Sequence, residues 1–150
     1  MKKFKFSLDS VLSYKQQILD ALQGEHAALL AEVRQQEELL ERCWQTYRDY
    51  NEEYREKSRI GVQLTEALIY QTNLRAMERE IQQETLVLEE KRKKEEEKRA
   101  EVVEAKKEST SIEKLKEKKL RAYQKAEAKS EELCIEDFVN MARILSRTEA

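Results

Sequence analysis

Residues 29–54 read LLAEVRQQEELLERCWQTYRDYNEEY, and mostly apolar side chains recur in them at alternating steps of four and three. The same spacing runs back to Leu8, so one line of side chains, the first seam, extends over nearly a third of the chain: Leu8, Leu12, Lys15, Leu19, Leu22, His26, Leu29, Val33, Gln36, Leu40, Cys43, Tyr47, Tyr50 and Tyr54. A seven-residue repeat kept over this length predicts a helix that packs against another helix as a coiled coil.

A second seam with similar spacing follows: Leu74, Met77, Ile81, Glu84, Leu88, Lys91, Glu95, Lys98, Val102, Ala105, Ser109 and Ile112. Between the two seams the repeat breaks at residues 57–61. Gly61 is the best candidate for the turn, because glycine fits the left-handed backbone conformation that ends many helices.

Folding the chain back near residue 60 aligns the two seams in one register. Apolar positions of the first seam then meet apolar positions of the second, with Leu40 facing Ile81. Polar interruptions also coincide, since His26 faces Glu95 and Gln36 faces Glu84. One register that explains two seams favours an antiparallel hairpin over one continuous helix.

We therefore predict an all-α fold, a long two-stranded antiparallel coiled-coil hairpin whose second helix is longer than the first. The whole chain, 1–150, is expected to form a single coiled-coil domain. Its first helix should span about 8–58, its turn about 59–63 and its second helix about 64–146.

The end of the second helix is expected to overhang from about residue 113, because the first helix runs out at Leu8, opposite Ile112. An apolar stripe nevertheless resumes in this overhang, with several residues at helical spacing: Leu120, Tyr123, Cys134, Phe138, Met141 and Leu145. A helix with an uncovered apolar stripe predicts a partner-binding surface. The alternatives are that Phe4 and Phe6 fold over the stripe, or that it self-associates.

Composition excludes several classes of function. The chain is 40% charged, but its 29 basic and 31 acidic residues nearly cancel, so no nucleic-acid partner is expected. A single histidine and two distant cysteines offer no metal site, and no glycine-rich phosphate loop is present. We expect no catalytic residue, no cofactor and no enzymatic activity. No apolar run suits a membrane span or a signal peptide, which predicts a cytoplasmic protein with reduced thiols.

Several short segments, in their order and spacing, resemble the flagellar export protein FliJ family. They are FKFSLDSVL at 4–12, YNEEYR at 50–55, residues 70–81, EKLKEKK at 113–119 and IEDF at 135–138. The resemblance covers nearly the whole chain. It implies a component of the flagellar type III export apparatus that resembles the coiled-coil stalk of rotary ATPases.

The resemblance also implies partners and surfaces. The expected partners are the flagellar export ATPase hexamer, the cytoplasmic domain of the export-gate membrane protein, and export chaperones, at the inner membrane of the flagellar base. An export-gate-binding surface maps to Tyr47, Tyr50, Tyr54 and Met77. For ATPase binding, the overhanging stripe is the natural candidate: Leu120, Tyr123, Phe138, Met141 and Leu145.

Two other functions stay open on the sequence. One is the equivalent stalk of a virulence type III secretion system. The other is a structural coiled-coil spacer that homodimerises. The sequence also leaves open whether the tyrosines near the turn belong to the seam or to an interface.

Overall fold

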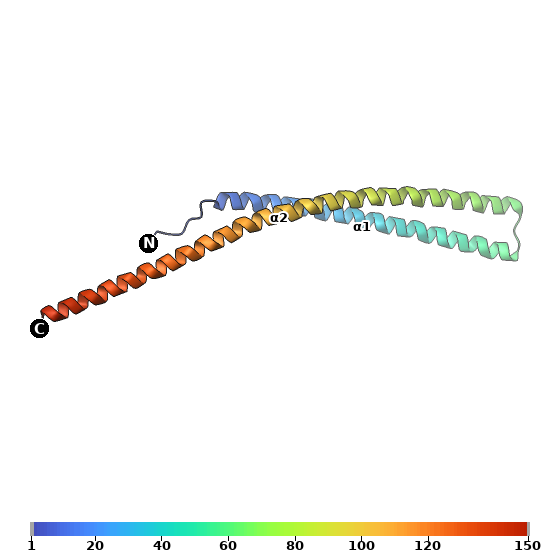
Figure 1. The fold of residues 1–150 in the computed structure, drawn as a ribbon. Helices are drawn as coiled ribbons and strands as arrows, with labels where there is room; N and C mark the ends of the chain where they lie inside the picture. Colours follow the sequence, from blue (N-terminus) through green and yellow to red (C-terminus); the bar gives the residue numbers. More distant parts are fainter. Residues whose placement is uncertain (1, 150) are drawn as a thin grey trace. The chain divides into compact units, whose positions relative to one another are not determined.

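The computed structural model describes residues 2–149 and consists of two helices (Figure 1). Helix α1 spans Asp9–Ile60 and helix α2 spans Leu64–Thr148. This confirms the predicted helical hairpin with a longer second helix. The chain divides into two compact units, one formed by the residues up to Leu19 with those from Glu104 onward, the other by Asp20–Val103.

The turn between the helices depends on Gly61. Its φ of +121° lies in the region that L side chains rarely adopt, and among the described residues it is alone in having a positive φ. The Gly61 N–H donates to the Lys57 carbonyl oxygen at 2.9 Å, which closes the last turn of α1. Only residues 61–63 separate the two helices, so α1 continues slightly beyond the predicted end at residue 58.

In the unit Asp20–Val103, hydrogen bonds between the helices fix the register. His26 Nε2 lies 2.7 Å from Glu95 Oε1, and Gln36 Nε2 donates to the Glu84 carbonyl oxygen at 3.1 Å. Both polar layers were predicted from the sequence and are confirmed. Apolar layers between and beyond them form the core, in which Val33, Tyr70, Ile81 and Leu88 are buried.

Lysines cover the weakest part of this core. Lys98, which the register places near Leu22, is largely covered itself, and its ammonium group reaches Glu25 at 2.9 Å. Its aliphatic stem can shield apolar surface while its charge stays at the rim. A charged seam position is thus accommodated without an unpaired charge.

In the other unit, the start of α1 packs on the middle of α2. Lys15 and Glu108 form an ion pair at 2.8 Å, and Lys116 Nζ lies 2.7 Å from Asp9 Oδ1. Leu12 and Phe6 are buried. Because Phe6 precedes α1, the extended segment before the helix also contributes to the core.

The predicted start of the overhang, at about residue 113, is wrong. Residues 2–6 run along α2 past the N-terminal end of α1. The centroid of the Phe4 ring lies 5.5 Å from that of the Tyr123 ring. The Tyr123 hydroxyl donates to the Lys2 carbonyl oxygen at 2.6 Å. An extended chain advances about 3.3 Å per residue against about 1.5 Å in a helix, so a few residues cover two turns of α2. The helix is therefore uncovered only beyond Tyr123.

Candidate interaction surfaces

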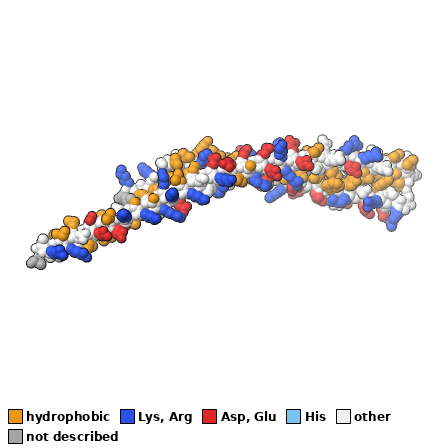
Figure 2. Space-filling view, in the orientation of Figure 1, with side chains coloured by type: hydrophobic (Ala, Val, Ile, Leu, Met, Phe, Trp, Pro, Cys, Tyr) orange, Lys and Arg blue, Asp and Glu red, His pale blue; other side chains and the backbone are white. Residues whose placement is uncertain are grey.

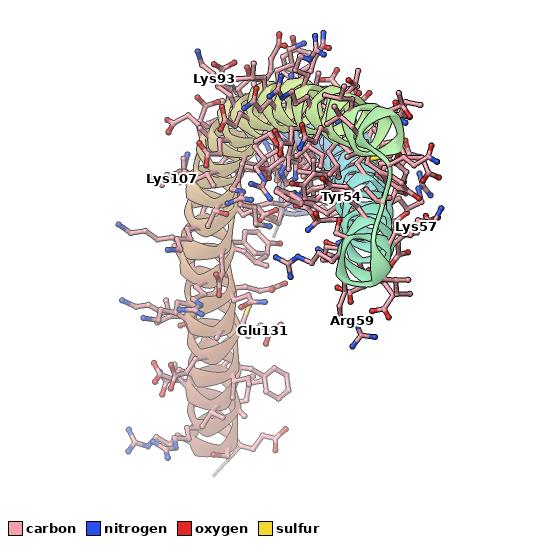
Figure 3. All side chains as sticks on the ribbon, turned by 90° about the vertical axis from the view of Figure 1, so that its right-hand side faces the viewer. Tyr54, Lys57, Arg59, Lys93, Lys107 and Glu131 are labelled. Carbon is pink, nitrogen blue, oxygen red and sulfur yellow. The ribbon has the colours of Figure 1, made fainter. Side chains whose placement is uncertain are left out.

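Three tyrosines meet near the turn. The Tyr70 ring, from α2, is 7% exposed and lies between two rings of α1, with centroids 4.9 Å from Tyr50 and 5.1 Å from Tyr54. The Lys57 ammonium lies 5.3 Å from the Tyr70 ring centroid. Figure 3 shows Tyr54 and Lys57 close to the end of α1. We call Tyr50, Tyr54 and Tyr70 the tyrosine cluster.

Hydrogen bonds hold the hydroxyl groups of this region. Tyr70 donates to Glu53 at 3.1 Å, and the Tyr50 hydroxyl accepts from Asn73 at 2.8 Å. Tyr47 donates to Glu78 at 2.9 Å, and this bond raises the pKa of Tyr47. The rings pack between the helices, while Tyr47, Tyr50 and Tyr54 keep half-buried edges at the surface. The geometry therefore permits both a role in the seam and a role in binding.

Met77 lies in the seam beside Cys43. Together they line a shallow hollow of about 250 Å³ on the face that carries Leu39 and Thr46. Burial raises the pKa of the Cys43 thiol, with smaller contributions from nearby carboxylates. The predicted gate-binding residues thus lie in one unit, but Met77 is half-buried rather than fully displayed.

A second, larger groove lies beside Trp44. It encloses about 500 Å³ and is lined mostly by uncharged residues: Trp44, Glu78, Ile81, Gln82, Thr85 and Leu86. The Trp44 ring packs edge-on against Tyr47, with centroids 5.9 Å apart. Trp44 lies off the seam, so the heptad pattern alone gave it no role. Exposed tryptophan is typical of protein interfaces.

The predicted ATPase-binding residues fall into two groups. Leu120 and Tyr123 are half-buried, and Tyr123 is held by the N-terminal segment. By contrast, Phe138 is 75% exposed, and Met141 and Leu145 are exposed as well. We call these last three residues the C-terminal stripe; Figure 2 shows hydrophobic side chains at this end of α2.

Further exposed apolar residues were not predicted. Four of them surround the C-terminal stripe: Leu133, Ile135, Val139 and Ile144. Since successive residues of a helix are separated by about 100°, Leu133 and Ile144 lie well away from the Phe138 face. A search along a single heptad line does not find apolar residues that lie beside that line on the helix surface. Others, Ile60, Leu64 and Leu68, lie at the hairpin turn, where the sequence showed only a break in the repeat.

The His26 layer is the most polar part of the hairpin core. Glu95 is 5% exposed and accepts hydrogen bonds from Arg99 at 2.6 and 3.0 Å in addition to its bond with His26. The hydrogen bond with His26, followed by those with Arg99, lowers the pKa of Glu95. Each of these partners is itself a residue of α1 or α2. The layer is suited to fixing the register of the hairpin.

Within residues 2–149, no cluster of three or more histidine, cysteine, aspartate or glutamate side chains could hold a metal ion. Neither helix contains, in its described residues, a stretch long and apolar enough to cross a membrane. Cys43 and Cys134 are both thiols rather than disulfide partners.

Comparison with known proteins gave one match. A family model described as flagellar FliJ protein matches residues 4–147, which is nearly the whole chain. No curated protein and no solved structure matches the chain significantly.

Proposed function

The chain belongs to the family of flagellar FliJ proteins, and on this premise we propose that it is a non-enzymatic stalk and chaperone-escort component of the flagellar type III export apparatus. Membership itself identifies a component of flagellar protein export. The proposed partners are the export ATPase hexamer, the cytoplasmic domain of the export gate and export chaperones. The proposed location is the cytoplasm, in peripheral association with the inner membrane at the flagellar base.

The exposed C-terminal stripe carries this proposal. Phe138, Met141 and Leu145 follow each other at steps of three and four on a part of α2 beyond the last contact with the N-terminal segment. Such an arrangement is typical of a helix that is inserted into an apolar site of a partner. We assign ATPase binding chiefly to these three residues and a smaller contribution to Leu120 and Tyr123.

The apolar surface of the stripe can contribute substantially to binding. Burying a large apolar side chain completely contributes roughly 1.5–3 kcal/mol. The three side chains of the stripe are about two-thirds exposed or more, so covering them would contribute about 3–6 kcal/mol before the cost of association. Aromatic anchors such as Phe138 account for much of the binding energy in many interfaces.

Gate binding is assigned to the tyrosines and Met77. Tyr47, Tyr50 and Tyr54 present partly exposed rings whose hydroxyls are oriented by Glu78, Asn73 and Gln71. Rings held in place lose little conformational entropy on binding, which favours affinity. This surface and the C-terminal stripe lie in different units of the chain, so each can be tested separately.

The decisive experiment measures stimulation of the purified export ATPase hexamer by this protein. The double variant Phe138→Ser/Leu145→Ser should lose most of the stimulation and co-purification. Val103→Ser removes an exposed apolar residue, 47% accessible, from the other unit and should leave both unchanged. Retained stimulation by the double variant, with normal helicity, would contradict the assignment.

A structural spacer that homodimerises through the same stripe is the second candidate, because a second copy could cover the exposed apolar residues. Sedimentation velocity separates the two. A monomer that binds the ATPase supports the stalk. A dimer that dissociates in the Phe138→Ser/Leu145→Ser variant and does not bind the ATPase supports the spacer.

A further inference from the structure

One face of α2 carries a row of positive charge, in the unit that also contains the C-terminal stripe. Its side chains follow one side of the helix at steps of seven, four, three, four and four, and we call them the basic row: Lys107, Lys114, Lys118, Arg121, Lys125 and Lys129. At about 1.5 Å per residue the row extends over about 33 Å. Every member is exposed, and Figure 3 shows Lys107 pointing outward from α2.

No acidic side chain interrupts the basic row. Successive residues of a helix are about 100° apart, so between residues 105 and 131 the side chains within about 60° of Lys125 are the basic row and four small residues, Thr110, Ser111, Ala122 and Ala128. Glu117 lies just outside this face, Glu104 precedes it and Glu132 follows it. Lys125 lies about 180° around the helix from Lys116, which contacts Asp9, so the row faces away from the start of α1.

Most of the basic row is not neutralised within the chain. Among the described residues, Arg121 is the one member that forms an ion pair, with Glu117 at 2.6 Å. Cations elsewhere in α2 do pair across the hairpin, as Lys98 does with Glu25. Like charges four residues apart destabilise a helix, and the row contains three such pairs: Lys114–Lys118, Arg121–Lys125 and Lys125–Lys129. An anionic partner would remove this repulsion.

We propose that the basic row binds an acidic helix of a partner protein. Glutamates three and four residues apart on such a helix match the spacing of the row, and the small residues between the lysines let a second helix approach closely. A shallow hollow of about 580 Å³ lies on this face, lined by Lys114, Glu117, Lys118, Arg121, Ala122 and Lys125. Lys118 lies about 200° around the helix from Phe138, so this surface is separate from the C-terminal stripe. The contact requires neither the ATPase nor the gate.

The composition of the basic row favours a protein over other polyanions. The row has no aromatic side chain on which bases could stack, and its one arginine is held by Glu117, so it offers few forked contacts to phosphates. On a membrane, an amphipathic helix inserts its apolar face between flanking cations, whereas here the apolar stripe lies on the side opposite the lysines. We therefore assign the row to an acidic helix and test nucleic acid and lipid as competitors.

The experiment uses the full chain and two fluorescently labelled peptides of about 22 residues, which is the length of the row. Both peptides are stapled as helices and have the same composition, but one carries its glutamates on a single face and the other distributes them around the helix. Fluorescence anisotropy should show binding of the single-face peptide that is at least about fivefold tighter. Raising the salt concentration from about 30 mM to about 300 mM should weaken this binding, because salt screens exposed charges.

Two lysine variants locate the contact. Lys118→Gln/Lys125→Gln should weaken binding of the single-face peptide about 2- to 25-fold, since each exposed ion pair contributes a factor of about 1.4 to 5. Its matched control, Lys93→Gln/Lys94→Gln, removes the same charge from two exposed lysines of α2 in the other unit and should have little effect. Circular dichroism establishes that each variant is folded. Both variants should still stimulate the export ATPase, because their C-terminal stripe is unchanged.

Equal affinity for the two peptides, or an equal loss in the two lysine variants, would overturn the proposal. So would displacement of the single-face peptide by double-stranded RNA or phosphatidylglycerol vesicles at a lower concentration of negative charge than the unlabelled peptide requires. Loss of ATPase stimulation in Lys118→Gln/Lys125→Gln would place the row in the ATPase surface and overturn a separate partner. Peptide binding as expected, without any stimulation of the ATPase by the unchanged protein, would contradict the proposed function alone.

Discussion

Replacing Tyr70 with alanine tests whether the tyrosine cluster holds the hairpin together. The Tyr70 ring is nearly buried, packs on Tyr50 and Tyr54, and donates a hydrogen bond to Glu53. Removing a buried aromatic ring usually costs about 3–5 kcal/mol. In a two-helix structure water fills part of the space, so we expect the lower end, about 3 kcal/mol.

Two further variants divide this loss into its parts. Tyr70→Phe removes only the hydrogen bond with Glu53 and should cost about 0.5–1.5 kcal/mol. Tyr14→Ala is the control, because Tyr14 is exposed on α1 and gains the same helix propensity from alanine. We expect that control to lie within about 0.5 kcal/mol of the unchanged protein.

Urea unfolding followed by circular dichroism at 222 nm provides the free energies of unfolding. The midpoint should fall for Tyr70→Ala at an unchanged slope, since the surface exposed on unfolding hardly changes. If Tyr70→Ala and Tyr14→Ala differ by less than about 1 kcal/mol, the ring does not contribute to the core. The cluster would then have to be explained as a binding surface alone.

Three other predictions concern single positions. Gly24→Ala should stabilise the protein by about 1 kcal/mol, because alanine favours the helix and the new methyl group meets nothing within 4 Å. Gly61→Ala should destabilise the protein by about 1–3 kcal/mol, because φ is +121° at that position. Melting temperatures of the two variants that shift in the same direction would contradict this. The lowered pKa of Glu95 means that its stabilising contribution is present above the pKa of the unfolded chain and is lost as the pH falls through the folded pKa. The melting temperature of Glu95→Gln should therefore depend less on pH between about 5 and 3, and parallel curves for both proteins would argue against the buried hydrogen bonds. The exposed Cys134 should react with a thiol reagent at pH 8 well before Cys43, whose pKa is raised by burial, and the variant Cys134→Ser should lose the fast phase.

The register of the hairpin could be predicted because it rests on side-chain spacing. A shift by one heptad would place His26 opposite an apolar layer and leave Glu95 without its partner. The coincidence of polar positions in both seams therefore selected one pairing, which the His26–Glu95 and Gln36–Glu84 bonds confirm. The position of the turn could also be predicted, because Gly61 adopts a backbone conformation that other residues avoid.

The covered length of α2 could not be predicted from the same spacing. A heptad count registers only helical residues, and the segment before Asp9 is extended. Its contact with Tyr123 depends on the Phe4 ring and a backbone carbonyl, neither of which leaves a periodic signal. As a consequence, the predicted ATPase surface included Tyr123, which the N-terminal segment partly covers.

The sequence predicted which residues belong to the candidate sites, but not how much of each side chain is exposed. Sequence spacing placed Tyr50 and Tyr54 in the seam, yet their exposure depends on how Tyr70 enters between them from α2. The exposed apolar residues at the hairpin turn, Ile60, Leu64 and Leu68, were missed for the opposite reason. They flank a break in the repeat, and a broken pattern gives no indication of which side chains are exposed.

Site-specific crosslinking with the export ATPase hexamer tests the stalk assignment most directly. A photoreactive phenylalanine analogue is placed at position 138, in the C-terminal stripe, and in separate proteins at position 14 and at position 64. We expect a covalent adduct with the ATPase only from position 138, suppressed by excess unlabelled protein. Crosslinking from position 64 and none from position 138 would mean that the turn end, rather than the end of α2, meets the ATPase.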